Sequence, residues 1–255
     1  MLKNKKIACI IPARLASTRF PRKMLATILG KPLLEWVWIA TQQVKHFDYV
    51  GFAIDSQETE AIIKKITPNY IMTSPECPSG TDRIIEVLNT NKIEADIWVN
   101  WQGDEPFISP AMIDTLLQSI DNPSNKPNQI WTLKKKICNE NEIPSPNFAK
   151  VVCDINDNAL YFSRSAIPFY REPLNSPEKT YYKHVGIYAY TPQALKEIEQ
   201  MAPSPLEDAE KLEQLRYIQN GLSIKIHETN EEVIGIDIPE HLEAATERMR
   251  KQLGL

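Results

Sequence analysis

The first half of the chain alternates four times between a short apolar run and a longer amphipathic pattern, which narrows the possible folds. The apolar runs cover residues 7–12, 49–54, 70–73 and 97–101, and helical patterns follow at residues 32–44, 58–66, 80–88 and 110–120. Unbroken apolar runs are typical of strands covered on both faces. Repeated strand–helix units predict a Rossmann-like, doubly wound α/β sheet that is mostly parallel.

The second half has a more mixed pattern. Strands are expected at residues 130–137, 149–154, 159–162, 184–190 and 223–227, and helices at residues 192–200, 206–220 and 239–252. Residues 167–180 are rich in proline and charge and are predicted to leave the sheet. Since neither an internal repeat nor a linker is evident, we expect a single domain with a mixed C-terminal half.

Composition excludes several classes of protein. A net charge of −4 argues against a nucleic-acid coat or a membrane-surface protein, so an anionic ligand needs a local cluster of Lys and Arg. The four cysteines are widely spaced and form neither a zinc motif nor a disulfide framework, which predicts a reduced, cytoplasmic protein. No apolar stretch reaches transmembrane length, and the run at residues 7–13 is short for a signal peptide.

A basic loop follows the first predicted strand. Within residues 12–23 it holds four cations: Arg14, Arg19, Arg22 and Lys23. The loop contains no glycine, so it is neither a P-loop nor a dinucleotide-binding turn. Arginine forks and a lysine point charge suit a triphosphate, whereas a solvated basic turn would account for the composition equally well.

Two carboxylates stand directly after apolar stretches. Asp104 follows the strand predicted at residues 97–101, and Asp237 follows another apolar segment. Ligands of open α/β sheets bind outside the carboxyl ends of strands. A carboxylate at that edge can hold Mg²⁺, although a turn-forming or helix-capping Asp is the simpler explanation for either residue alone. Together with the basic loop they predict metal-assisted phosphoryl transfer.

A set of motifs resembles the 3-deoxy-manno-octulosonate cytidylyltransferase (CMP-KDO synthetase) family. These motifs are P-A-R-x-x-S-T-R-x-P-x-K-x-L at 12–25, S-G-T-D-R at 79–83, Q-G-D-E-P at 102–106, Y-F-S-R at 161–164, K-H-x-G-I-Y at 183–188, S-P-L-E at 204–207, L-E-Q-L-R at 212–216 and G-x-D-x-P-E at 235–240. They run through almost the whole chain in the family's order. The resemblance implies a nucleotide-diphospho-sugar transferase fold, with a nucleotide-binding half at about residues 1–125 and a sugar-binding and dimer half at about residues 126–255.

The resemblance also implies a reaction. The anomeric hydroxyl of 3-deoxy-D-manno-octulosonate attacks the α-phosphate of CTP, pyrophosphate leaves, and the CMP-sugar serves lipopolysaccharide synthesis. Asp104 and Asp237 match the family's Mg²⁺-binding pair, and Arg14, Lys23 and Asp104 its catalytic group. The expected nucleotide-binding residues are Ala13, Arg14, Ser17, Arg19, Lys23, Ser79, Gly80 and Asp104.

A second group of residues matches the family's sugar pocket. It comprises Gln102, His184, Tyr188, Glu213 and Gln214, with Arg83 and Arg164 as partners for the sugar carboxylate. A packing histidine is the alternative for His184, and a helix brace is the alternative for Glu213. Glu207 and Glu210 are expected to be structural. Residues 167–180 correspond to the family's dimer contact, so the resemblance implies a homodimer.

Two departures and two rival functions remain open from sequence. Ile54 stands where the family commonly has Thr, and Trp101 replaces a smaller apolar residue; we expect Trp101 to restrict the space for a larger sugar acid. One rival is a cytidylyltransferase for N-acetylneuraminate, which Ser17-Thr18-Arg19 and Lys23-Met24 disfavour. The other is a catalytically silent nucleotide-binding protein, which the retained Lys23, Asp104 and Asp237 disfavour.

Overall fold

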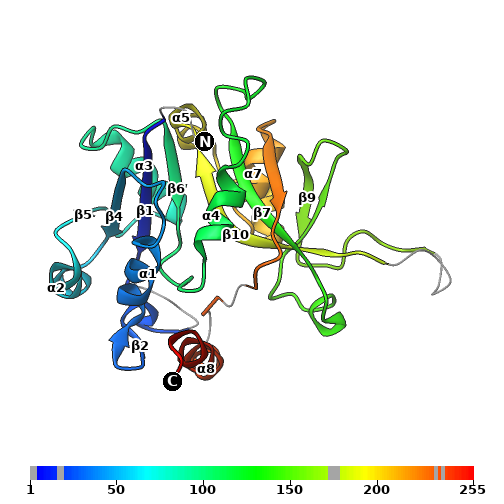
Figure 1. The fold of residues 1–255 in the computed structure, drawn as a ribbon. Helices are drawn as coiled ribbons and strands as arrows, with labels where there is room; N and C mark the ends of the chain where they lie inside the picture. Colours follow the sequence, from blue (N-terminus) through cyan, green and yellow to red (C-terminus); the bar gives the residue numbers. More distant parts are fainter. Residues whose placement is uncertain (1–4, 16–19, 172–178, 233–234, 237–238) are drawn as a thin grey trace. The chain divides into compact units, whose positions relative to one another are not determined.

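The computed structural model describes residues 5–15, 20–171, 179–232, 235–236 and 239–255 (Figure 1). The chain divides into two compact units. The N-terminal unit takes in residues 4–113 and 232–255, and the central unit takes in residues 114–231. None of the helices in the described ranges is long and apolar enough to cross a membrane.

Four parallel strands form the sheet of the N-terminal unit. Their order is β6 (Ile97–Asn100), β1 (Ile7–Ala13), β4 (Tyr49–Ile54) and β5 (Tyr70–Met72). All seven residues of β1 are buried, as the apolar run predicts for a strand covered on both faces. The parallel strands and their helices confirm the predicted α/β fold.

Four helices follow these strands, and the second and third begin at side-chain caps that the sequence carries. They are α1 (Leu33–Thr41), α2 (Gln57–Ile66), α3 (Gly80–Asn89) and α4 (Pro110–Leu117). The Ser56 hydroxyl accepts a hydrogen bond from Thr59 N at the start of α2, and the Ser79 hydroxyl accepts from Asp82 N at the start of α3. Each cap satisfies a main-chain donor that the first turn of a helix leaves free.

A small hairpin between the basic loop and α1 was not predicted. Strands β2 (Thr27–Ile28) and β3 (Lys31–Pro32) are antiparallel, and Leu29 and Gly30 connect them with φ angles of +49° and +79°. Positive φ at both turn residues is the requirement of a type I′ hairpin turn, which glycine meets easily and leucine does not. Because leucine is not a typical turn residue, the residue types at Leu29 and Gly30 did not predict this turn.

The C-terminal helix α8 (His241–Leu253) belongs to the N-terminal unit, which corrects the expected division near residue 125. One buried apolar cluster explains why the C-terminal segment packs within the N-terminal unit. It combines residues from both ends of the sequence: Ile28, Leu33, Trp36, Phe107, Ile236, Ala245 and Met249. Burial of such a cluster outweighs the small additional cost of closing a long loop.

The central unit is built on a mixed sheet. β10 (Tyr182–Tyr190) is antiparallel to β7 (Ile130–Lys136) and to β8 (Lys150–Cys153), β11 (Ile224–Glu228) is parallel to β7, and β8 is antiparallel to β9 (Ala159–Ser163). Its helices are α5 (Pro192–Glu199), α6 (Pro205–Glu210) and α7 (Gln214–Gln219). The mixed C-terminal half is confirmed.

The single helix expected at residues 206–220 is wrong. The chain instead forms α6 and α7, and Lys211 ends α6 with a left-handed backbone at φ +52°. A left-handed residue cannot continue a right-handed helix. The apolar residues keep their helical spacing across Lys211, so the sequence pattern could not reveal the break between α6 and α7.

The proline-rich excursion at residues 167–180 is described at residues 167–171 and 179–180. These parts form no helix or strand, as expected. The Tyr170 hydroxyl donates to Thr180 O at 3.0 Å and accepts from Thr180 N at 2.9 Å, so it joins the two described stretches. The predicted dimer contact falls in part on residues 172–178, outside the described ranges.

A buried lysine joins a loop of the central unit to the end of a strand. Lys150 is 0% exposed, and its Nζ donates to the carbonyls of Ser145, Phe148 and Arg164 at 2.8, 2.7 and 2.5 Å. An ammonium group has three donors, so these carbonyls use all of them. The side chain therefore holds the loop at residues 145–148 against the end of β9.

We expect Lys150→Met to lower the free energy of unfolding by about 3 kcal/mol, because it leaves buried carbonyls without a donor. The measurement is urea denaturation at neutral pH. Lys126→Met, at an exposed lysine of the same unit, is the control and is expected to be neutral within about 0.5 kcal/mol. Equal midpoints for the two variants would contradict the assignment.

Candidate active site

Three parallel strands of the N-terminal unit end at one edge of its sheet. β1, β4 and β6 finish at Ala13, Ile54 and Asn100. Polar residues follow each end: Arg14, Asp55, and the turn of Gln102, Gly103 and Asp104. Ligands of open parallel sheets bind outside such ends. The predicted nucleotide residues Ala13, Arg14 and Asp104 therefore come from adjoining strand ends.

An ion pair joins Lys23 and Asp104. Lys23 Nζ lies 2.5 Å from Asp104 Oδ2, and the side chains are 8% and 22% exposed. Lys23 belongs to the 3-10 turn η1 (Lys23–Leu25), where Lys23 N donates to Phe20 O and Ala26 N donates to Lys23 O. The pair is partly shielded from water, so each charge compensates the other until a ligand arrives. A polyanion can take Lys23, and a cation can take Asp104.

Two glycines permit the close packing of this edge. A Cβ at Gly103 would lie 3.0 Å from Pro12 O and from Met24 Sδ. A Cβ at Gly80 would lie 2.9 Å from Gln102 Nε2. A side chain at Gly103 would press on the main chain of β1 at Pro12, whereas one at Gly80 would displace the Gln102 amide.

Ser79 and Gln102 have partners within the unit. The Ser79 hydroxyl accepts from Asp82 N at 3.1 Å and lies 2.6 Å from Asp82 Oδ2, as the cap of α3. Gln102 Nε2 donates to Asn100 Oδ1 at 2.9 Å. These contacts orient both residues, while their roles toward nucleotide and sugar stay predictions.

Arg83 is committed to contacts inside the N-terminal unit. Its side chain is 2% exposed, and Nη2 donates to Asp55 Oδ2 at 3.1 Å. Nη1 donates to the Thr73 hydroxyl and, at 3.2 Å, to Ser74 O. The prediction that Arg83 binds a sugar carboxylate has no support from this geometry, because the guanidinium is already surrounded by protein acceptors.

Trp101 does not restrict a ligand directly, which corrects the expectation from sequence. The residue is 0% exposed, and its indole Nε1 donates to Glu105 O at 2.9 Å. Its ring meets Phe47 edge to face, with centroids 6.4 Å apart. A side chain with no exposed surface lies in the core and cannot line a pocket for the sugar.

His184 of β10 is a neutral, oriented imidazole in the central unit. Burial lowers its pKa to about 3. Its Nε2 lies 3.0 Å from the Thr132 hydroxyl, which itself lies 2.8 Å from Ile187 O. The Thr132 hydroxyl has one hydrogen, which the Ile187 carbonyl takes, so we assign the donating N–H to His184 Nε2. The Nδ1 atom is then the acceptor.

A break in the strand register brings His184 and Tyr188 together. The pairing of β10 with β7 shifts between Val185 and Tyr188. Residues four apart in a regular strand are separated by about 13 Å. The two rings have centroids only 5.3 Å apart, and the Phe162 ring also meets His184, edge to face, with centroids 5.0 Å apart. A β-bulge re-aims side chains in this way and is often found beside active sites.

Tyr188 is a protonated phenol near the start of α7. Burial, followed by Tyr190 and Glu213, raises the pKa of Tyr188 well above its usual value, so its hydroxyl is a donor at neutral pH. Glu213 Oε1 accepts from the Tyr217 hydroxyl at 2.5 Å, which agrees with a bracing role in the helix. The neighbouring Gln214 is buried.

Arg164 joins the end of β9 to α6. Its Nε donates to Glu210 O and its Nη1 donates to Pro146 O, both at 2.8 Å. Glu210 returns two bonds, since its carboxylate accepts from the Ser163 hydroxyl and from Arg164 N. Glu207 completes a capping box with Ser204 and meets Arg216 Nε at 3.1 Å. The two glutamates are structural, as predicted; the sugar role of Arg164 stays a prediction.

Three predicted site residues, Ser17, Arg19 and Asp237, lie outside the described ranges. Arg14 is exposed at the end of β1. The residue before Asp237 is described: Ile236 N donates to Asp104 O at 3.2 Å. This bond connects the G-x-D-x-P-E segment to the turn that carries Asp104.

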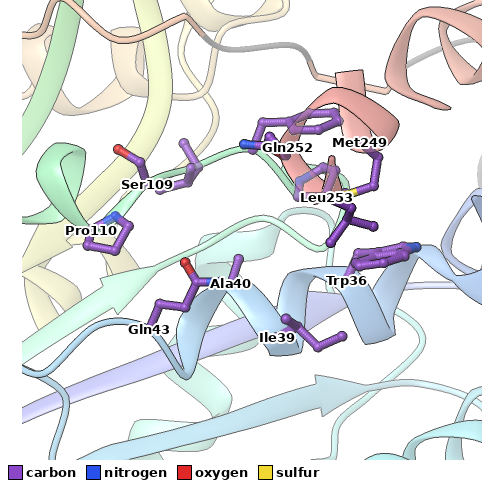
Figure 2. A pocket seen from close by; sticks show the side chains of 12 residues that line it. Trp36, Ile39, Ala40, Gln43, Ser109, Pro110, Met249, Gln252 and Leu253 are labelled. Atoms are coloured by element: carbon purple, nitrogen blue, oxygen red, sulfur yellow. The ribbon is translucent and has the colours of Figure 1, made fainter. Parts of the chain in front are cut away.

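A cavity of ≈ 270 Å³ in the N-terminal unit has mostly apolar walls (Figure 2). Trp36 and Ile39 of α1, and Gln43 just after it, face Met249 and Leu253 of α8 across it. The residues that line it include none of the predicted site residues. The cavity therefore adds nothing to the site at the strand ends.

Sequence reasoning missed two residues that shape the site. Asp55 follows β4 as Asp104 follows β6, so the strand-end argument that found Asp104 would have found Asp55 as well. Thr132 orients His184 through a hydrogen bond between strands. The register of β10 against β7 includes a bulge, so no local sequence signal pointed to Thr132.

Comparison with known proteins gives consistent matches. A family model described as cytidylyltransferase matches residues 8–226. The 3-deoxy-manno-octulosonate cytidylyltransferase of Geobacter sulfurreducens is 43% identical over 253 residues, which is 96% of this chain and 99% of that protein. The enzyme of the same name from Pelobacter propionicus is 44% identical over 253 residues, covering 96% and 97% of the two chains.

A solved structure gives the same result. It is described as CMP:2-keto-3-deoxy-manno-octonic acid synthetase complexed with CTP, and it is 39% identical with a TM-score of 0.87, covering 97% of this chain and 99% of that one. Sequence and fold thus agree over nearly the full length. The chain belongs to the 3-deoxy-manno-octulosonate cytidylyltransferase family.

Proposed function

We propose that this chain transfers CMP from CTP to 3-deoxy-D-manno-octulosonate, giving CMP-KDO and pyrophosphate, and so activates the sugar for lipopolysaccharide synthesis. The observation that carries the proposal is the Lys23–Asp104 ion pair at the strand ends, in a chain whose relatives bear the name of this enzyme. The solved relative described as a complex with CTP supports the nucleotide. The four cysteines of the chain are free thiols, which fits the reducing cytoplasm.

The residues of the N-terminal unit receive the nucleotide in this proposal. Lys23 exchanges its partner Asp104 for phosphate oxygens and neutralises part of the triphosphate charge. Arg14, exposed at the end of β1, adds a second cation, and Arg19 is assigned to the same loop by its motif. The anomeric hydroxyl then attacks the α-phosphorus while the cations hold the departing pyrophosphate.

Mg²⁺ is the proposed cofactor, with Asp104 and Asp237 as its protein ligands. The donor set fits, because Mg²⁺ usually takes one or two carboxylates and completes its shell with phosphate oxygens and water. The Ile236–Asp104 main-chain bond joins the two segments that carry these carboxylates. When bound, the ion would polarise the α-phosphate and neutralise charge on the leaving group.

Residues of the central unit are proposed to bind the sugar acid. The His184 Nδ1 accepts from a sugar hydroxyl, and the Tyr188 hydroxyl donates to one. Both rings are held by neighbouring aromatic rings, so they lose little freedom when the sugar binds. Gln214 and Glu213 at the start of α7, and Gln102 in the N-terminal unit, are the further candidates.

We expect Asp104→Asn to lower kcat by about a hundredfold or more at saturating Mg²⁺, because charge stabilisation at a preorganised site contributes several kcal/mol. Asp237→Asn is expected to behave alike. The measurement is pyrophosphate release with CTP and the sugar acid. Asp96→Asn is the matched control, since Asp96 precedes the same strand β6 and accepts from Lys6 N at 2.8 Å. Turnover of Asp104→Asn equal to that of Asp96→Asn would refute the metal role.

A twofold dimer through residues 167–180 is the second expectation. Phe169 is 86% exposed in this segment and supplies an apolar side chain for such a contact. Light scattering is expected to give twice the chain mass of 29.2 kDa for the unmodified protein. Phe169→Asp is expected to shift the mass toward one chain, and Ile155→Asp, at a residue 99% exposed in the same unit, is expected not to. A monomeric mass for the unmodified protein would exclude the dimer.

The acceptor preference is the third expectation. We expect kcat/KM for 3-deoxy-D-manno-octulosonate to exceed that for N-acetylneuraminate by about ten thousandfold, because a poorly matched sugar leaves polar groups of the site unpaired. The two acids are compared at fixed CTP and Mg²⁺. Similar values would keep cytidylyl transfer and overturn the choice of sugar. Absence of pyrophosphate release with either acid would point to the catalytically silent alternative.

A further inference from the structure

Asp55 connects three segments of the N-terminal unit that are distant in sequence. It follows β4 directly, and its side chain is 7% exposed. One carboxylate oxygen, Oδ1, accepts from Leu15 N at 3.0 Å. The other, Oδ2, accepts from Arg83 Nη2 at 3.1 Å. The carboxylate therefore lies between the start of the basic loop and helix α3.

The bond to Leu15 continues the parallel pairing of β1 and β4. The register of these strands ends with the pair Ala13↔Ile54. Beyond this pair, Leu15 N donates to the side chain of Asp55, the residue after Ile54. A hydrogen bond to a carboxylate is stronger than one to a neutral carbonyl. The chain thus leaves the sheet at Leu15 in a direction that Asp55 sets.

Arg83 holds the Asp55 carboxylate in place. Its Nη1 donates to the Thr73 hydroxyl and to Ser74 O, and the Thr73 hydroxyl in turn donates to Ile54 O at 2.9 Å. The guanidinium is therefore anchored to the ends of β4 and β5. Asp55 and Arg83 have almost no exposed surface, so water does not compete for their contact.

We propose that Asp55 is a positioning residue for the nucleotide: braced by Arg83, it fixes the main chain at Leu15 and thereby the entry of the basic loop at residues 12–23. This proposal rests on the proposed function, in which that loop receives the triphosphate. Arg14 stands immediately before the fixed peptide, and Lys23 stands at the far end of the loop. Asp55 touches no reacting atom; it acts through the loop.

The alternative is that Asp55 serves the fold alone, and the chain offers a matched control for this. Asp48 lies before β4 and accepts from Ile7 N at 2.8 Å through Oδ2. It makes the same kind of bond to the same strand, β1, at the opposite end. A variant of Asp48 therefore removes an equivalent carboxylate–peptide bond far along the strand from the basic loop.

The first measurement is steady-state kinetics of Asp55→Ala and Asp48→Ala. For Asp55→Ala we expect KM for CTP to rise by more than about tenfold, with KM for the sugar acid within about twofold, because one charge-assisted hydrogen bond that orders the loop is lost. Asp48→Ala is expected to leave both KM values within about twofold. A lower kcat with unchanged KM for CTP in both variants would be the signature of a structural role and would overturn the proposal.

The second measurement does not depend on activity. Amide hydrogen exchange at Leu15, followed by NMR on the unliganded protein, is expected to accelerate by about tenfold or more in Asp55→Ala and to be unchanged in Asp48→Ala. In Asp55→Asn, whose amide oxygen can still accept from Leu15, the rate is expected to be intermediate; this variant also replaces Asp55→Ala if the latter does not fold. Equal Leu15 exchange in the unmodified protein, Asp55→Ala and Asp48→Ala would overturn the proposal, even if the unmodified enzyme proved to use another substrate.

Discussion

The ion pair between Lys23 and Asp104 is the contact on which the arrangement at the strand ends depends. It joins the basic loop to the turn after β6 and keeps a cation and a carboxylate together with little exposure to water. Separating the charges without a ligand would leave each poorly solvated, so the site is compact before CTP arrives. In the proposed function, a triphosphate with Mg²⁺ would provide both replacement partners at once. Nucleotide binding would then be an exchange of ion pairs, in which Lys23 contacts phosphate and Asp104 contacts the metal.

Several motif residues of the chain make their polar contacts with other groups of the protein. The S-G-T-D-R segment supplies a helix cap through Ser79, a close approach through Gly80 and an internal ion pair through Arg83. Arg164 of Y-F-S-R likewise donates to main-chain carbonyls. Motif residues that look like ligand contacts in sequence thus include residues whose polar groups bind other groups of the protein. A buried arginine with several protein acceptors belongs to the second kind, because moving it toward a ligand would leave those acceptors unpaired.

Sequence alone predicted most of the strands and helices and the position of Asp104 beyond a strand end, because apolar periods, caps and strand-end positions are local signals. It failed where distant contacts decide the structure. The left-handed Lys211 divides a continuous helical pattern, and α8 returns to the N-terminal unit through a cluster that joins both chain ends. Trp101 was taken for a wall of the sugar pocket, although its indole is bonded inside the core. In each case the residue type allowed several environments, and only packing selected one.

The bulge in β10 determines which side chains meet, and residue types alone do not predict that contact. In a regular strand His184 and Tyr188 would be too far apart to touch, whereas the shifted register brings their rings within 5.3 Å. Burial by the surrounding rings then keeps the imidazole neutral and the phenol protonated, as the directions of both pKa shifts indicate. The pair therefore presents one acceptor and one donor of fixed orientation across the physiological pH range. Such a pair suits the recognition of neutral hydroxyl groups, which is the role proposed for it, whereas the proposed function assigns the charged triphosphate to Lys23 and Arg14.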